Sequence, residues 1–267
     1  ITRYRYNGVP MDNGGRYFYI NDNGTVWNPG WKPCKTPLDS YECRHGMNYT
    51  RITGSKNGIE ASVLFFVPLK TWAEVQKVTL KNTTTYTKKI KLFSFAEWCL
   101  WNAATDMENF QRNFSTGEVE VDGSVIYHKT EYKERRNHYA FYSVNAPVDG
   151  FDTDRETFIG LYNEFRDPQN VMAGVSTGSI AHGWSPVASH YIEVELQPGE
   201  SKDYVFLLGY VENEQEEKFV LDAEGKLVFD VPGLLHSGSS PVINKAKAQE
   251  LIAAFDTTEK VDAAFAE

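Results

Sequence analysis

Cysteine is scarce in this chain, and its arrangement has no metal or disulfide pattern. Only Cys34, Cys43 and Cys99 occur in 267 residues. An odd number without C-x-x-C spacing predicts neither a disulfide framework nor a zinc site. The six histidines also lack metal-ligand spacing, and no serine lies in a G-x-S-x-G motif. We therefore expect no metal site and no serine-hydrolase triad.

An excess of positive charge and long apolar runs are also missing. The chain has 27 Lys and Arg against 36 Asp and Glu, for a net charge of −9. Such a chain repels phosphate backbones and anionic lipid, which argues against nucleic acid and membrane surfaces as partners. No apolar stretch approaches the roughly 20 residues of a membrane span, and no signal segment opens the sequence. We expect a cytoplasmic protein.

The two ends of the sequence predict a piece of a longer polypeptide. The chain begins without Met inside an alternating pattern, and it stops inside a helical pattern with no closing glycine or asparagine. A domain that normally packs against further domains is expected to expose an apolar or aromatic patch.

A period of two dominates the chain and predicts a mainly β protein. The runs are rich in β-branched and aromatic residues and are bounded by turn residues. They cover residues 61–68, 73–82, 88–98, 138–146, 156–163, 191–196 and 203–212. Asp122 and Gly123 predict a type I′ hairpin, and Pro198 and Gly199 another tight turn. So many antiparallel strands favour a large β-sandwich, whose two layers bury the inward faces.

Only the last thirty residues change to a helical period. Residues 243–255 predict one helix, and 256–265 predict a second with Asp256 as N-cap and Glu259 three positions later. We expect these two short helices to connect the sandwich to a following domain, with a boundary near residue 240.

Two groups of residues are candidate functional sites. Asp152 and Asp154 are close in sequence, but two carboxylates on a polar stretch are typical of a solvated face rather than a catalytic pair. Trp27 and Trp31, and Trp98 and Trp101, suit the stacking of sugars on indole rings. Tryptophans in a large sandwich are also typical core residues, so an exposed platform of Trp27 and Trp31 would be needed to favour a binding module.

A further candidate is the run "NFQRNFSTGE", which places Gln111, Arg112 and Asn113 after an aromatic stretch. A polar turn between strands explains the pattern equally well. Amides and a guanidinium are also groups that bind sugar hydroxyls, because they offer several fixed donors.

Long runs of this sequence resemble a known family. They include "RYRYNGVPMDNGGRYFYINDNGTVWNPGW", "YECRHGMNYTRI", "LFSFAEWCLWNAATDMENFQRNFSTGEVE" and "YHKTEYKERRNHYAFYSVN". These runs are similar to the N-terminal region of the inverting phosphorylases of glycoside hydrolase family 94, and to the cellobiose phosphorylases within it. The similarity spans essentially the whole chain.

The resemblance implies an architecture and a reaction. Residues 1–240 would be the N-terminal β-sandwich (supersandwich) without its first strands, and 241–267 the start of a helical linker to an (α/α)₆ barrel. The whole enzyme would be a homodimer that converts cellobiose and inorganic phosphate to α-glucose 1-phosphate and glucose with inversion. Its acidic aspartate and phosphate-binding groups would lie in the barrel, so no catalytic residue is assigned here. The resemblance implies no organic cofactor and no metal, with inorganic phosphate as the co-substrate.

The same resemblance implies a role for the loop. Gln111 and Arg112, with Asn113 beside them, would bind the acceptor-side glucose in the partner subunit's active site. Two other classes of function stay open, namely a free-standing carbohydrate-binding module and a purely structural or dimerising domain.

Overall fold

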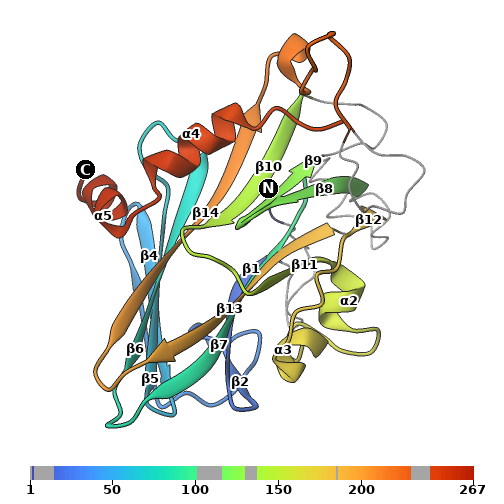
Figure 1. Cartoon of the computed structure of the whole chain (residues 1–267). Helices are drawn as coiled ribbons and strands as arrows, with labels where there is room; N and C mark the ends of the chain where they lie inside the picture. Colours follow the sequence, from blue (N-terminus) through green and yellow to red (C-terminus); the bar gives the residue numbers. More distant parts are fainter. Residues whose placement is uncertain (1, 3–14, 101–115, 130–136, 185, 230–240) are drawn as a thin grey trace.

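Two antiparallel sheets packed face to face make up most of the protein (Figure 1). The computed structural model describes residues 2, 15–100, 116–129, 137–184, 186–229 and 241–267. The predicted mainly β sandwich with a few short helices is confirmed. The longest predicted strands are confirmed most closely, because β6 spans Ala73–Asn82 and β7 spans Lys88–Glu97.

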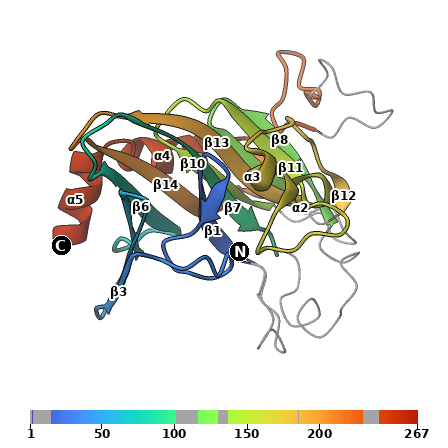
Figure 2. The ribbon, with the colours of Figure 1, turned by 90° about the horizontal axis from the view of Figure 1, so that it is seen from below.

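Within the described residues, the smaller sheet has five strands and the larger has nine. In spatial order the five are β11 (Gly150–Asp154), β13 (Pro186–Leu196), β7, β1 (Arg16–Asp22) and β2 (Thr25–Trp27). The nine are β12 (His182–Trp184), β8 (Thr116–Asp122), β9 (Val125–Lys129), β10 (His138–Val144), β14 (Ser201–Glu212), β6, β5 (Ile59–Phe66), β4 (Tyr49–Lys56) and β3 (Ser40–His45). The β3–β4 hairpin projects from the body of the domain (Figure 2).

Strand alternation fills the space between the sheets with apolar side chains. Phe18 and Ile20 of β1 point inward, as do Val78 and Leu80 of β6. Each of these four side chains is almost completely buried. Burial of apolar surface on this scale is the main force that stabilises a sandwich.

Short helices cover the outer faces of both sheets (Figure 1). Helices α4 (Ala246–Ala254) and α5 (Thr258–Ala266) pack on the outer face of the nine-stranded sheet. Helices α2 (Arg155–Ile159) and α3 (Gln169–Ala173) cover part of the five-stranded sheet. Among the described residues, a 3₁₀ turn, η2, spans Gln215–Glu217. The sequence predicted the last two helices but not α2 and α3.

The strand predicted at 156–163 is wrong. Asp154 caps α2 by accepting a hydrogen bond from the backbone N–H of Thr157 at 2.8 Å, and Gly160 ends the helix at φ 95°. The adjacent residues Phe158 and Ile159 are both buried, which a strand with one solvated face does not allow.

Two predicted local details are shifted by one residue. The turn of the β8–β9 hairpin has Gly123 and Ser124 at its centre, because Asp122 pairs with Val125. Of the two central residues only Gly123 has positive φ, which fits a type II′ rather than a type I′ turn. The N-cap of α5 is Thr257 rather than Asp256, whose carboxylate pairs with Lys260 at 2.7 Å.

The two ends of the sandwich differ in their connections. At one end, here the turn end, strands are joined by tight turns at residues 23–24, 57–58 and 197–200. At the other, here the loop end, Arg16 pairs with Ala96 and His138 pairs with Glu212. Longer connections leave the sheets there, and long connections carry binding residues more often than tight turns do.

Candidate functional site

The predicted binding loop leaves the sandwich at the loop end, after β7, and returns at β8. Gln111, Arg112 and Asn113 lie outside the described residues, so their role in binding stays a prediction. The residues on either side of the loop are described, and they show how its two ends are held in place.

Both flanks pack against one buried imidazole. Trp98, which follows β7, is 1% exposed and stacks on His128 with ring centroids 5.5 Å apart and an interplanar angle of 15°. Gly117, in β8, lies so close to the same ring that a Cβ atom there would come within 2.2 Å of it. The two ends of the loop are therefore fixed relative to each other by His128.

Burial keeps this imidazole uncharged. Desolvation, with a smaller effect from nearby His138, lowers the pKa of His128 to about 3. At neutral pH the ring is thus an apolar surface for Trp98 rather than a cation.

A buried ion pair holds the end of β7 from the other side. Arg155 of α2 donates through Nε to Glu97 Oε1 at 2.9 Å, and its guanidinium lies 5.1 Å from the ring centre of Phe165. Only 3% of the Glu97 side chain is exposed. Removing one partner of such a pair leaves a buried charge, so this contact constrains the strand from which the loop departs.

The tryptophans named from the sequence do not form an exposed platform. Trp27 and Trp98 are core residues, whereas Trp31 is 44% exposed. Trp101 lies outside the described residues. The core interpretation is confirmed for Trp27 and Trp98. The exposed platform of Trp27 and Trp31 that would favour a binding module is not formed, because Trp27 is buried.

An exposed aromatic side chain that the sequence analysis missed lies at the loop end. Trp72, in the connection between β5 and β6, is 66% exposed, and Val67 and Leu69 of the same connection are 55% and 69% exposed. Three exposed apolar side chains in one connection are consistent with the expected apolar patch, which stays a prediction. The run "VPLKTW" indicates exposed apolar residues, since it places three large apolar side chains between two strands. Its first two residues, however, belong to the predicted strand 61–68.

A pocket of about 360 Å³ lies beside Trp72, where the space between the two sheets opens to solvent. Thr2, which forms a β-bridge with Trp98, lines the pocket and places it near the departure of the loop. Arg16 from the smaller sheet and Glu74 from the larger sheet meet in the pocket, with Nε and Oε1 2.5 Å apart. An ion pair therefore bridges the two sheets at this opening.

A chain of buried polar groups positions the Glu74 carboxylate. Gln76 Nε2 donates to Glu74 Oε1 at 2.7 Å, and the Tyr142 hydroxyl donates to Gln76 Oε1 at 2.9 Å. Gln76 and Tyr142 are fully buried. The carboxylate is thus held in place from the core outward, as a preorganised binding group would be.

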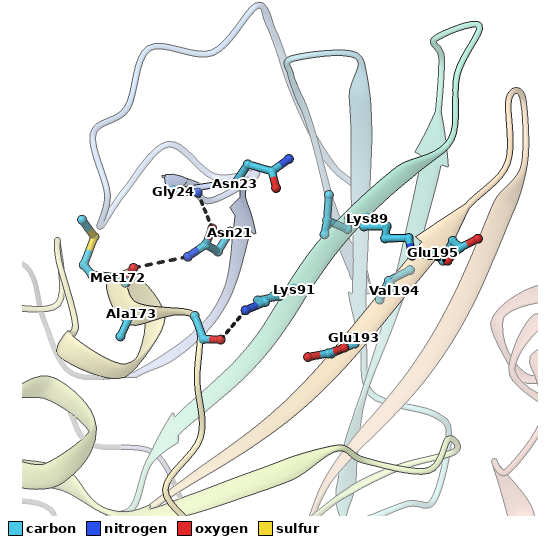
Figure 3. Close-up of a pocket in the computed structure, with 12 residues that line it drawn as sticks. Asn21, Asn23, Gly24, Lys89, Lys91, Met172, Ala173, Glu193, Val194 and Glu195 are labelled. Carbon is cyan, nitrogen blue, oxygen red and sulfur yellow. Dashed lines mark hydrogen bonds and ion pairs between the residues drawn. The ribbon is translucent and has the colours of Figure 1, made fainter.

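A second hollow, of about 590 Å³, lies on the outer face of the five-stranded sheet beside α3 (Figure 3). Lys89 and Lys91 of β7 face Glu195 and Glu193 of β13 as directly opposed cross-strand pairs. Lys91 donates to the carbonyl of Gly174 at 2.6 Å. Among the described residues that line this hollow, none is aromatic. Its polar groups act mainly on one another and on α3, so we interpret it as a solvated sheet face.

Asp152 is not on a solvated face, and that expectation is wrong. Its side chain is 1% exposed and accepts hydrogen bonds from the Asn170 amide at 2.9 Å and the Ser179 hydroxyl at 2.8 Å. Thr177 also donates to it. Asp152 therefore ties β11 to α3 and the segment that follows, while neighbouring Asp154 caps α2.

The described residues also bear on a metal site and on a membrane-spanning helix. Within the described ranges, no group of three or more His, Cys, Asp or Glu side chains is arranged to hold a metal ion. In the same part of the chain, none of the helices has both the length and the apolarity needed to cross a bilayer.

Comparison with known proteins identifies the domain. Residues 1–224 match the family model "Glycosyl hydrolase 94, supersandwich domain". The chain is 31% identical over 227 residues to solabiose phosphorylase of Paenibacillus borealis, covering 83% of this chain and 30% of that protein. It is 31% identical over 214 residues to N,N'-diacetylchitobiose phosphorylase of Vibrio proteolyticus, covering 78% of this chain and 27% of that protein.

A more distant relative is 3-O-beta-D-glucopyranosyl-beta-D-glucuronide phosphorylase of Paenibacillus borealis, 26% identical over 240 residues, which cover 84% of this chain and 30% of that protein. The chain thus spans less than a third of the length of these relatives. The family match covers most of the chain, and the fold described above agrees with it. The chain belongs to the glycosyl hydrolase 94 supersandwich domain family.

Proposed function

We propose that this chain is the N-terminal domain of an inverting disaccharide phosphorylase. The observation that carries the proposal is the family match over residues 1–224, together with relatives that are themselves named disaccharide phosphorylases. Residues 1–240 would form the sandwich and 241–267 the start of a linker to an (α/α)₆ catalytic barrel. The parent protein would act in the cytoplasm as a homodimer.

The proposed reaction needs one acid and no metal. Phosphate attacks the anomeric carbon of the non-reducing sugar while a carboxylic acid protonates the leaving glycosidic oxygen, which yields a sugar 1-phosphate of inverted configuration. Phosphate takes the place of the water in an inverting hydrolase, so the second carboxylate of that mechanism is not required. In this proposal the acid and the phosphate site belong to the barrel.

This chain would contribute to the acceptor side of the site. Gln111, Arg112 and Asn113 would bind hydroxyls of the leaving sugar across the dimer interface. The packing of Trp98 and Gly117 on His128 supports the proposal, because it fixes both ends of the loop on a rigid frame. A loop with fixed ends loses less conformational freedom when it binds a ligand.

Cellobiose is the proposed substrate of the parent enzyme. The relatives are named for different disaccharides, among them solabiose and N,N'-diacetylchitobiose, so a panel of substrates is needed. The purely structural alternative predicts that loop variants leave acceptor kinetics unchanged. The binding-module alternative predicts sugar binding without any phosphorolysis by the complete protein.

The test uses the protein encoded by the complete reading frame and, separately, the 267-residue chain. Each is incubated with phosphate and cellobiose, solabiose or N,N'-diacetylchitobiose, and sugar 1-phosphate is assayed. We expect the complete protein to release α-glucose 1-phosphate from cellobiose and the chain alone to release none. Activity of the repurified chain alone, or a complete protein inactive on every disaccharide, would contradict the proposal.

A further inference from the structure

We propose that the pocket beside Trp72 binds one pyranose ring of a carbohydrate, with the indole against the sugar face and the Arg16–Glu74 pair at its hydroxyls. The proposal concerns different residues from Gln111–Asn113. The inference does not depend on phosphorolysis, because it concerns binding by the sandwich itself.

The aromatic side of the pocket is already in place. Trp72 and Tyr210 stack with centroids 5.7 Å apart and an interplanar angle of 22°, so the Tyr210 ring supports an indole that stays 66% exposed. The backbone of Tyr210 donates to the carbonyl of Trp72 at 2.9 Å, and the Tyr210 hydroxyl donates to Glu212. The C–H groups of a pyranose suit such a surface, since they meet the negative face of the ring. Because the rings are held before binding, little side-chain freedom is lost.

The polar side of the pocket offers groups that match sugar hydroxyls. The side chains of Arg16 and Glu74 are 36% and 22% exposed. The contacts that position Glu74 use Oε1, and among the described residues none uses Oε2. Arg16 is held with its guanidinium 5.0 Å from the ring centre of Phe65. A carboxylate oxygen that accepts and a guanidinium that donates can bind neighbouring hydroxyls together.

The size of the pocket also fits a single sugar ring. A volume of about 360 Å³ is at the lower end of the range of small-molecule pockets. The hollow of Figure 3 is larger, at about 590 Å³, yet its described lining residues include no ring on which a sugar could stack. Size alone therefore does not favour the smaller pocket as the sugar site. The aromatic pair of Trp72 and Tyr210 does.

A protein partner is the competing occupant, because Val67 and Leu69 are exposed beside Trp72. A protein surface that covered the pocket would remove water from the Arg16–Glu74 pair and would have to replace its hydrogen bonds. A sugar brings hydroxyls that do so directly. The paired charges next to the aromatic platform therefore favour a carbohydrate.

The test titrates the 267-residue chain with cellobiose, without phosphate, by calorimetry and by saturation-transfer NMR. Sorbitol serves as a polyol that cannot stack as a ring. Trp72→Ala should raise the Kd for cellobiose at least tenfold, and Trp72→Phe, which keeps a ring, should raise it less. Trp31→Ala removes another exposed tryptophan, away from this pocket, and should bind as wild type.

Binding of cellobiose but not sorbitol, with loss in Trp72→Ala, would support the subsite. No binding by the wild-type chain, or equal Kd values for wild type and Trp72→Ala, would overturn it. Self-association that Trp72→Ala abolishes, without sugar binding, would also overturn it and identify a protein contact. Since no phosphate is present, these outcomes are independent of the phosphorolysis assay.

Discussion

The turn end and the loop end of the sandwich differ in whether their polar and aromatic side chains already have partners within the chain. At the turn end, local polar side chains satisfy the backbone, and Asn82 is the clearest case. Its amide donates to the carbonyls of Tyr86 and Leu196 at 2.7 and 3.0 Å and accepts from the backbone of Thr84 at 2.9 Å. At the loop end, aromatic rings and charged pairs stay partly open to solvent around Trp72.

This difference separates stability from binding. Groups at the turn end already have their partners within the chain, so they are not available to a ligand. At the loop end the frame formed by Trp98, Gly117 and His128 is buried. The Arg16–Glu74 pair beside Trp72 stays partly exposed and can form hydrogen bonds with a ligand. Substitutions in the frame and in the turns should therefore change the free energy of unfolding, and substitutions of the exposed groups should change binding.

The largest effect is expected from Trp98→Ala in the buried frame. Loss of a fully buried indole should lower the free energy of unfolding by about 3–5 kcal/mol, from lost burial and the cavity left against His128. Urea denaturation of the chain measures it. Trp31→Ala is the matched control and should cost less than about 1 kcal/mol. A Trp98→Ala chain as stable as this control would show that the frame is not rigid.

A pH series tests the neutral state of His128. Because burial lowers its pKa in the folded state to about 3, the unfolded chain takes up a proton first as the pH falls below about 6.5. The stabilising contribution is complete above the unfolded pKa and is lost progressively toward pH 3. Between pH 6 and pH 4, wild type should lose roughly 2–3 kcal/mol more stability than His128→Gln.

The same series includes His190→Gln as a second buried histidine. Burial lowers the pKa of His190 to about 3 as well, so its variant should show a similar difference. Parallel pH profiles for wild type and His128→Gln would contradict an uncharged, buried imidazole beneath the loop.

At the turn end, Asn82→Ala should lower the free energy of unfolding by about 2–3 kcal/mol, because buried carbonyls lose their donor. Thr83→Ala in the same connection removes one hydrogen bond, to the carbonyl of Gly58, and should cost no more than about 1 kcal/mol. Thermal and urea denaturation measure both. A change in cellobiose binding by Asn82→Ala in the folded chain would break the separation between the two ends.

Periodicity predicted the strands well wherever one face of a long run is buried. β6 was predicted to the residue, since its alternation and its bounding turns agree. It failed at α2, where five residues form a helix because Asp154 caps it and α2 packs on the sheet. Packing of α2 on the sheet favours a helix in that segment, and the local periodicity of the sequence does not indicate such packing.

The candidate site was predictable only in part. Trp98, in the aromatic stretch before the loop, packs on His128 where β7 ends. Trp72 was not predicted as a site residue, although it lies between the predicted strands 61–68 and 73–82, because local periodicity does not indicate whether a tryptophan in a connection is exposed. Asp152 was assigned to solvent because its partners Asn170, Thr177 and Ser179 are 18 to 27 residues away in sequence.

The central claim, that the loop end contributes to an acceptor-sugar site, is tested most directly by Arg112→Ala in the complete protein. One charge-assisted hydrogen bond should be lost, on the order of 2 kcal/mol or roughly 30-fold. In the synthetic direction the KM for glucose should rise by about that factor, while the KM for glucose 1-phosphate changes little and the fold survives. Equal kinetics for wild type and Arg112→Ala, or an equal rise in both KM values, would contradict the account.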